Sequence, residues 1–281
     1  MFNILEMLPP LPRIKVIDIG AMSLGQGTEP YFPLMELNMV DVTGFEPIDK
    51  EYKKLLQSAP SNYRYFPYFI GNGSNGTFYE CNYPMTSSLY EPNTELLSKF
   101  QNLENFVQVV KKHKVQTKRL DDIKEIVDTD LIKVDVQGGE LDVFQGATKL
   151  LESAVLIQTE VEFLPLYKNQ PLFADIDSHL RQHGFVFHNF AGLSGRMFKP
   201  LVDTGNINRW ISQPLWSDAI YVKDFMKIEL LKDEKLLKLI VILHSLYGSF
   251  DLCCMLLNSY DSRHKTKLGE MYLDRLINAT K

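Results

Sequence analysis

The stretch that decides the fold is "LIKVDVQGGELDVFQGA", residues 131–147. Its first four residues are mostly apolar, and the run ends in an acid, Asp135. Gly138 and Gly139 then loosen the backbone, and Glu140 opens a segment whose apolar residues recur at helical spacing. The pattern predicts a buried strand that delivers a carboxylate to a turn, followed by a helix.

The same alternation of strand and helix continues on both sides of this stretch. Strands are predicted over 15–21, 40–47, 64–71, 154–163, 185–190 and 218–223, and helices over 30–38, 50–57 and 172–184. Strand and helix alternation implies an α/β fold, with a doubly wound, mostly parallel sheet covered by helices on both faces.

Two segments depart from this alternation. Residues 72–105 are rich in Gly, Asn, Ser and Pro, which favours a hairpin insertion over a crossover helix. Extended segments follow over 105–123, with a helix start at Asp121 or Asp122. Residues 225–281 read as a helical C-terminal extension. We therefore divide the chain into a Rossmann-like domain, 1–224, and this extension, whose helices could cover the sheet or form a homo-oligomer.

Composition narrows the classes of partner. The chain has 281 residues, 45% of them hydrophobic, which suffices for a large core. Its net charge is −5 and no long basic block appears, so nucleic acid is a poor candidate partner. Cys81, Cys253 and Cys254 have neither the number nor the spacing of a disulfide framework or a zinc site.

The chain offers no clear targeting or membrane-spanning signal. The N-terminal segment contains Glu6 and three prolines, and it lacks the basic start and apolar run of a signal peptide. The most apolar stretch, 236–257, is broken by Lys238, His244 and Asp251, so we read it as packed amphipathic helices. We expect a cytoplasmic protein without a transmembrane segment, and peripheral membrane contact stays open.

Acids at strand ends indicate a ligand site. Glu46, Asp135 and Glu160 lie at or near such ends, and parallel sheets bind ligands in the crevice beyond them. Glu46 suits the acid that accepts hydrogen bonds from both ribose hydroxyls of a nucleoside. The run after the first strand, "GAMSLGQG", lacks the middle glycine of a dinucleotide fingerprint at Met22. A nucleoside without phosphates, such as S-adenosylmethionine, therefore fits better than a dinucleotide.

Five segments, in their order and spacing, resemble the FkbM family of S-adenosylmethionine-dependent methyltransferases. They are "VIDIGA", "GFEP", "RLDDI", the opening stretch and "IQTEVEFLPLYKNQPLFADIDSHLRQHGFVF". The resemblance covers about residues 14–223 and is most specific at Asp-x-x-Gly-x-Glu and the following Thr-Glu-Val strand. One departure is that Met22 stands where the family usually has Asn, with Gly25 as the nearest following glycine.

The resemblance implies a class I methyltransferase fold and methyl transfer to hydroxyl groups of sugars, glycolipids or natural products. It also implies a place for each cofactor contact. These are Asp18, Gly20 and Ala21 near the methionine end, Glu46 on the ribose, Gly71 and Asn72 beside the adenine, and Asp135 below the sulfonium.

A hydroxyl acceptor needs a general base because its pKa is too high for free ionisation near neutrality. Asp135 and Glu160 are the catalytic candidates. Glu140, Glu162 and His188 are candidate substrate contacts, although Glu140 also suits the first turn of a helix and His188 an ordinary place in a strand. A divalent metal on Asp135 and Glu160 would suit carboxylate oxygens, but no third ligand is identifiable.

Two other classes remain open from the sequence. A nicotinamide-dependent oxidoreductase would use the same sheet and ribose acid, but it needs the phosphate turn that Met22 interrupts. A non-catalytic binding protein on a degenerate methyltransferase fold would contact its partner through 72–105 or the C-terminal helices. The run Asp135, Val136, Gln137, Gly138 lacks the Pro-Pro-aromatic motif of many amino-group methyltransferases, so an oxygen acceptor is preferred.

Overall fold

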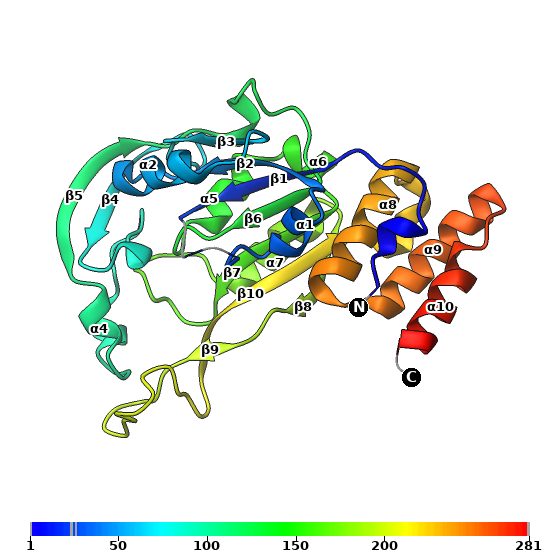
Figure 1. Ribbon diagram of the computed structural model, residues 1–281. Coiled ribbons are helices and arrows are strands. Elements are labelled where there is room, and N and C mark those ends of the chain that lie inside the picture. Colours follow the sequence, from blue (N-terminus) through cyan, green and yellow to red (C-terminus); the bar gives the residue numbers. More distant parts are fainter. Residues whose placement is uncertain (1, 23–24, 26, 280–281) are drawn as a thin grey trace.

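The computed structural model describes residues 2–22, 25 and 27–279, and within them eight strands form one sheet (Figure 1). The sheet order is β3-β2-β1-β6-β7-β10-β8, with β9 paired to β10. The four neighbouring pairs from β3 to β7 are parallel, and β10 runs antiparallel to β7, β8 and β9. The strands are β1 (Ile14–Ile19), β2 (Val40–Phe45), β3 (Tyr63–Phe66), β6 (Leu131–Val134), β7 (Leu156–Glu162), β8 (Phe185–Phe190), β9 (Ser194–Gly195) and β10 (Pro214–Lys223).

Helices cover both faces of this sheet, so the doubly wound α/β fold is confirmed. The helices are α1 (Phe32–Glu36), α2 (Asp49–Ser58), α3 (Thr94–Leu97), α4 (Leu103–Phe106), α5 (Glu140–Gln145), α6 (Leu150–Ser153), α7 (Phe173–Gln182), α8 (Asp233–Ile242), α9 (Phe250–His264) and α10 (Leu268–Ala279). Among the described residues, no helix is both long and apolar enough to cross a membrane.

Alternate side chains along the strands enter two different cores, as the pleat of a strand requires. Val16 and Leu131 pack in the core that contains α8, α9 and α10. Their neighbours Ile17 and Ile132 pack in the core beneath α5, α6 and α7. This double burial explains why β1 and β6 are almost continuously apolar in sequence. It also means that residues 225–279 share a core with the sheet.

Buried ion pairs fasten the C-terminal helices to the sheet. Asp130, which is fully buried just before β6, accepts hydrogen bonds from the Lys235 and Lys238 ammonium groups at 2.6 and 2.9 Å and from the Lys15 backbone N–H at 2.8 Å. Lys238 is itself only 1% exposed and also pairs with Glu234. Each buried charge therefore has a partner of opposite sign, which its burial requires.

The predicted insertion is a hairpin whose second strand lies beyond the expected boundary. β4 (Asn75–Cys81) pairs antiparallel with β5 (Val109–Gln116), so the hairpin extends past residue 105. It lies at the opposite end of the molecule from α8, α9 and α10 (Figure 1). The strand predicted over 64–71 is also shorter than expected, because β3 ends at Phe66, before Pro67, which has no N–H for the ladder.

Two helix predictions around Gly146 were wrong. The helix expected to begin at Asp121 or Asp122 is only a 3-10 turn, Leu120–Asp122. Asp121 instead caps a different helix, since its carboxylate accepts the N–H groups of Lys149 and Leu150 at 3.0 and 3.1 Å, at the start of α6. The helix expected to open at Glu140 is short, because α5 ends at Gln145 and α6 follows as a separate helix. A Cβ at Gly146 would lie 2.1 Å from the carbonyl oxygen of Gly71, so the chain passes too close there for a side chain.

Candidate functional site

The site lies where the strand order changes direction. β1 is followed by β2 on one side and pairs with β6 on the other, which makes their carboxyl ends the switch point of the sheet. Gly20 directly follows β1 with φ +79°, and a Cβ there would lie 1.9 Å from the carbonyl oxygen of Asp135. Both its conformation and its closeness to Asp135 therefore require glycine.

A lysine that the sequence reading did not single out organises the ends of β1 and β6. The Lys133 ammonium lies 3.2 Å from Asp18 Oδ1 and 3.9 Å from Asp135 Oδ2, and it donates to the carbonyl oxygen of Gly20 at 3.0 Å. Burial lowers the pKa of Lys133, but the charges of Asp18 and Asp135 outweigh it and the net pKa is raised. Asp18 also accepts the hydroxyl of Tyr31 at 2.7 Å. Lys133 therefore remains a cation between two acids.

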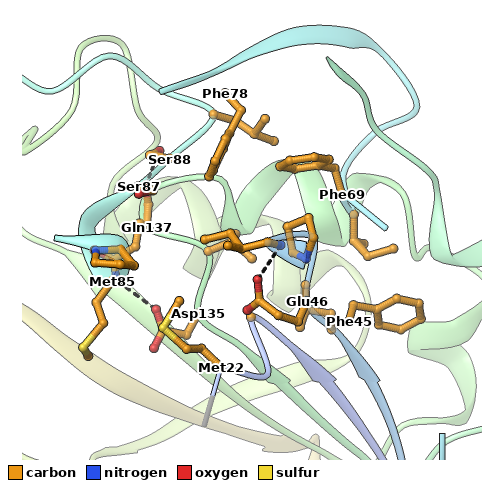
Figure 2. A pocket seen from close by; sticks show the side chains of 18 of the residues that line it. Met22, Phe45, Glu46, Phe69, Phe78, Met85, Ser87, Ser88, Asp135 and Gln137 are labelled. Carbon is orange, nitrogen blue, oxygen red and sulfur yellow. Dashed lines mark hydrogen bonds between the residues drawn. The ribbon is translucent and has the colours of Figure 1, made fainter. Parts of the chain in front are cut away.

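The first cavity, here called the cofactor cavity, opens at the ends of β1, β2 and β6 (Figure 2). Glu46 and Asp135 approach it from the ends of β2 and β6, on either side of β1, and Phe69 and Phe78 face it from the other side. Its described lining consists of Ile19, Gly20, Met22, Phe45, Glu46, Pro47, Ile48, Tyr68, Phe69, Ile70, Phe78, Pro84, Met85, Ser87, Ser88, Leu89, Lys133, Asp135, Val136 and Gln137. Acids on one side and aromatic rings on the other match the ribose and the base of a nucleoside.

Glu46 is the most buried acid of this cavity. It is 2% exposed, and its Oε1 accepts the Ile48 N–H at 2.7 Å. Burial is the largest influence on its pKa, which is raised to about 7, although the Ile48 N–H and Lys133 act in the opposite direction. A buried carboxyl with one protein donor has acceptor capacity left for hydroxyls of a ligand.

Three of the predicted cofactor contacts line the cavity, and four do not. Gly20, Glu46 and Asp135 do. Asp18 and Ala21 are buried outside its lining, and Asp18 reaches it only through Lys133. Gly71 and Asn72, expected beside the adenine, are also outside, because Gly71 packs against Gly146 and the Asn72 amide donates to Asp142 at 2.8 Å. Phe69 and Ile70, one or two residues earlier, form the wall instead.

A second cavity, here called the acceptor cavity, adjoins the first and has a volume of about 440 Å³, which lies in the usual range for small ligands. Glu160 and Glu162, at the end of β7, belong to its wall. The described lining consists of Tyr83, Met85, Thr86, Leu97, Leu103, Phe106, Val107, Gln137, Glu160, Glu162, Leu166, Tyr167, Arg196, Ile207, Asn208 and Trp216. Two lining residues, Met85 and Gln137, are shared with the cofactor cavity.

Gln137 links the two cavities chemically. Its side-chain amide donates to Asp135 Oδ1 at 2.9 Å and to Glu160 Oε2 at 2.7 Å, and its Oε1 lies 3.1 Å from the hydroxyl of Tyr167. Its backbone φ is +59°, in the left-handed region that few residues other than glycine adopt. Such strain, at a residue that bridges two acids, indicates a functional constraint.

The two acceptor-cavity acids are electrostatically unfavourable as carboxylates. Burial is the first cause that raises the pKa of Glu160 well above its usual range, and the charges of Asp135 and Glu162 add to it. Burial also raises the pKa of Glu162, which is 1% exposed, with the charge of Glu140 next. In the described parts of the chain, neither acid has an ion pair within 4.0 Å.

Two of the three predicted substrate contacts lie outside the acceptor cavity. Glu140 is buried at the start of α5, where its Oε1 accepts the N–H groups of Val136 and Gly138 at 2.9 and 3.2 Å and so closes the loop after β6 from inside. His188 lies on β8, and its Nε2 is 2.7 Å from the Ser249 hydroxyl beside α9. Both residues therefore fit structural roles. Of the three predicted substrate contacts, only Glu162 lines the acceptor cavity.

A metal between Asp135 and Glu160 would meet the Gln137 amide, whose nitrogen lies between the two carboxylates. No group of three or more His, Cys, Asp or Glu residues among those that the structure describes could hold a metal ion.

The sequence positions of Lys133 and Gln137 carry a signal that they belong to the site. Lys133 interrupts an apolar strand next to Asp135, and such a buried cation needs an acid partner. Gln137 follows the strand within the loop that carries Gly138 and Gly139. Nothing local predicts the contribution of Met85, Arg196 or Trp216, which long connections bring to the cavity.

A doubly wound sheet with acids and aromatic rings around a cavity at its switch point is typical of an α/β protein that binds a nucleoside-containing cofactor. The family model described as the methyltransferase FkbM domain matches residues 18–187, more than half of the chain. The chain therefore belongs to the FkbM family of methyltransferases, and S-adenosylmethionine is its cofactor. This membership favours methyl transfer over the oxidoreductase and the non-catalytic alternatives.

Three solved structures that are similar to this chain are distant from it in sequence. One, described provisionally as a methyltransferase from Thermoplasma acidophilum, is 12% identical over 76% of this chain and 70% of that chain, with a TM-score of 0.37. The N-terminal domain of EvdMO1 with SAH bound is 8% identical over 75% of this chain and 74% of that one, with a TM-score of 0.36. The same domain in the presence of SAH and D-fucose is 8% identical over 75% and 76%, with a TM-score of 0.35. A search of curated proteins found no match.

Proposed function

We propose that the protein is an O-methyltransferase that methylates a hydroxyl group of a small-molecule or glycan acceptor. The observation that carries the proposal is the bridge Asp135–Gln137–Glu160 at the place where the two cavities share a wall. It puts a candidate base in the acceptor cavity within one side chain of the acid that reaches the cofactor cavity.

The cofactor cavity suits the group it is proposed to hold. Glu46 would accept the ribose hydroxyls, and Phe69 and Ile70 would flank the adenine in place of Gly71 and Asn72. Asp135 would face the cationic sulfur, held in position by Lys133 and Gln137. When bound, S-adenosylmethionine supplies a methyl group on a positively charged sulfur, which an acceptor oxygen can attack in line.

Glu160 is the better candidate for the general base. It lines the acceptor cavity, which Asp135 does not, and the Gln137 amide fixes its Oε2. As the new carbon–oxygen bond forms and the carbon–sulfur bond breaks, the proton of the acceptor hydroxyl would pass to the Glu160 carboxylate. Burial and the neighbouring acids raise its pKa, which makes the Glu160 carboxylate a stronger base than an ordinary glutamate.

The test is methyl transfer from labelled S-adenosylmethionine to glycans and small molecules of a cell extract, with products identified by mass spectrometry. Glu160→Gln should lower kcat by about 10²–10⁴-fold while SAH affinity by calorimetry is unchanged. Glu46→Gln should instead weaken SAH binding by roughly 10–100-fold. The wild-type kcat should rise with pH through a pKa above that of an ordinary Glu, because the base acts only when deprotonated. An unaltered kcat for Glu160→Gln would remove Glu160 from the mechanism.

A cytoplasmic location is part of the same proposal. In its support, the three cysteines Cys81, Cys253 and Cys254 are free thiols, as a reducing compartment would leave them. A homo-oligomer through the C-terminal helices also stays a prediction, and the exposed Met271 and Leu273 on α10 are the apolar side chains that it would cover.

A further inference from the structure

The acids of the acceptor cavity differ from those beside the cofactor cavity in that they lack a nearby cation. In the cofactor cavity, Lys133 stands between Asp18 and Asp135. The acceptor cavity has Arg196 as the single cation of its described lining, and Arg196 forms no ion pair with Glu160 or Glu162, although its Nε has no hydrogen-bond partner among the described residues. It donates to the carbonyl oxygen of Gly195 at 2.7 Å, and its guanidinium lies 5.2 Å from the ring centre of Trp216. Among the described residues, neither Glu160 nor Glu162 thus has a cation that would stabilise its carboxylate.

Glu162 provides a second observation that points to a ligand. It lines the cavity at 1% exposure, and its Oε2 has no hydrogen-bond partner among the described residues. The Gln170 amide lies close enough to lower its pKa, but the nitrogen of this amide also lacks a hydrogen bond of normal geometry. A buried carboxyl oxygen without a partner is costly, and a ligand that donates to it would recover that cost.

The neighbours of Glu162 strengthen the demand for a positive charge. The charges of Asp135 and Glu140 raise the pKa of both Glu160 and Glu162, and Asp218 acts in the same direction on Glu160. Trp216 is the direct cross-strand neighbour of Glu162, and it lines the cavity together with the aromatic rings of Tyr83, Phe106 and Tyr167. Aromatic faces attract both sugar rings and ammonium groups.

We propose that the acceptor carries a protonated amine beside the hydroxyl that is methylated, and that Glu162 pairs with this ammonium while Glu160 takes the hydroxyl proton. An amino sugar is the simplest acceptor of this class. The inference rests on the proposed O-methyltransferase function and deepens it: Glu160 is the base, and Glu162 is the residue that selects the acceptor.

The test compares three sugars by titration calorimetry on the SAH-loaded protein at pH 6, where the amine of D-glucosamine is protonated. D-Glucosamine should bind roughly 10–100-fold more tightly than N-acetyl-D-glucosamine or D-glucose, the difference expected for a charge-assisted hydrogen bond. Because burial and the nearby acids raise the pKa of Glu162 and an ammonium group would lower it, D-glucosamine binding should release protons, measured by repeating the titration in buffers of different ionisation enthalpy. The neutral sugars should release none.

Two variants test whether Glu162 itself recognises the ammonium group or whether the net charge of the protein attracts it. Glu162→Gln should reduce D-glucosamine affinity to that of the neutral sugars and remove the proton release, while SAH affinity is retained. Glu229→Gln, which removes the same charge from an exposed position, should behave as wild type. Equal affinity for the three sugars, or no detectable D-glucosamine binding, overturns the inference, and this comparison needs no variant to fold. Failure of the wild type to bind SAH would instead contradict the proposed function.

Discussion

At the scale of single residues, Glu46 is buried at a cost to folding. Its pKa is about 7 in the folded protein, whereas the unfolded chain has the ordinary value of 4.5. Between these values the folded state keeps a proton that the unfolded state releases, so stability falls as pH rises from about 4.5 to 7, and the deficit is complete above 7.

Glu46→Gln removes this titration. The free energy of unfolding of the variant, relative to wild type, should therefore be higher at pH 8 than at pH 5, by about 2–3 kcal/mol at most. Urea denaturation at the two pH values measures the difference. Glu229→Gln, at an exposed site, should show no such pH dependence. An equal gain at both pH values would mean that Glu46 is not the buried acid described.

Gln137 is the second residue whose replacement is informative. Gln137→Leu removes the donor that favours the ionised form of Glu160, so the pKa of Glu160 should rise further. The acid limb of the pH–kcat profile should then move to higher pH, and kcat near neutrality should fall by roughly 10-fold or more. Tyr167→Phe removes the contact to Gln137 Oε1, together with a hydrogen bond to the Thr86 carbonyl oxygen, but leaves the Gln137 amide on Glu160, so it should give a smaller change in the same direction. A lower kcat with an unshifted profile would contradict the assignment.

At the scale of elements, the passage between α5 and α6 depends on close chain contact. A Cβ at Gly146 would lie 2.1 Å from the Gly71 carbonyl oxygen, although the backbone at Gly146, with φ −85°, would accept alanine. Gly184 is the opposite case, because its φ is +77° but nothing lies within 4 Å of an added Cβ.

Gly146→Ala therefore measures the cost of adding a Cβ where there is no space, and Gly184→Ala measures the cost of a positive φ. We expect Gly184→Ala to cost about 1–2 kcal/mol of unfolding free energy. Gly146→Ala should cost about 3 kcal/mol or more, because the backbone of Gly71 must move. It should also weaken SAH binding, since Ile70 in the cofactor cavity precedes Gly71. Thermal denaturation and calorimetry measure the two effects, and equal costs for the two variants would contradict the packing argument.

The elements also divide into those that the sequence could predict and those that it could not. The strand over 185–190 and the helix around 172–184 follow local apolar periodicity, and the structure has them as β8 and α7. The second strand of the hairpin, β5, is polar and largely exposed, so periodicity gives no signal for it. Asp121 looks like a helix start locally but caps α6 from outside that helix.

The site divides in the same way. The places of Glu46, Asp135 and Glu160 on the cavity walls were predictable because each stands at or near the end of an apolar strand, whereas their roles stay predictions. Gly71 and Asn72 were placed by a family pattern one or two residues beyond the actual wall. The bridge through Gln137 joins residues 135, 137 and 160, and the cavity wall adds residues from 83 to 216. Such long-range approach depends on tertiary packing, which a local sequence pattern does not contain.

At the scale of the whole molecule, the C-terminal helices and the sheet should unfold together because they share one core. Asp130→Ala leaves the buried Lys238 ammonium without its Asp130 partner and should cost about 3–5 kcal/mol. Asp128→Ala, at a half-exposed site that pairs with Lys15 and Lys235, should cost about 1 kcal/mol or less. Urea denaturation followed by both fluorescence and circular dichroism should give one coincident transition for each variant. Separate melting of the helices would contradict the shared core.

Met85 and Gln137 belong to the walls of both cavities, so a ligand that moves either side chain changes the shape of both cavities. The affinities of the two substrates are then thermodynamically linked. If bound cofactor changes the affinity for the acceptor by some factor, bound acceptor must change the affinity for the cofactor by the same factor, because the free energy of the cycle does not depend on the order of binding. Cooperativity between donor and acceptor would thus follow from two shared side chains, without any motion of the sheet.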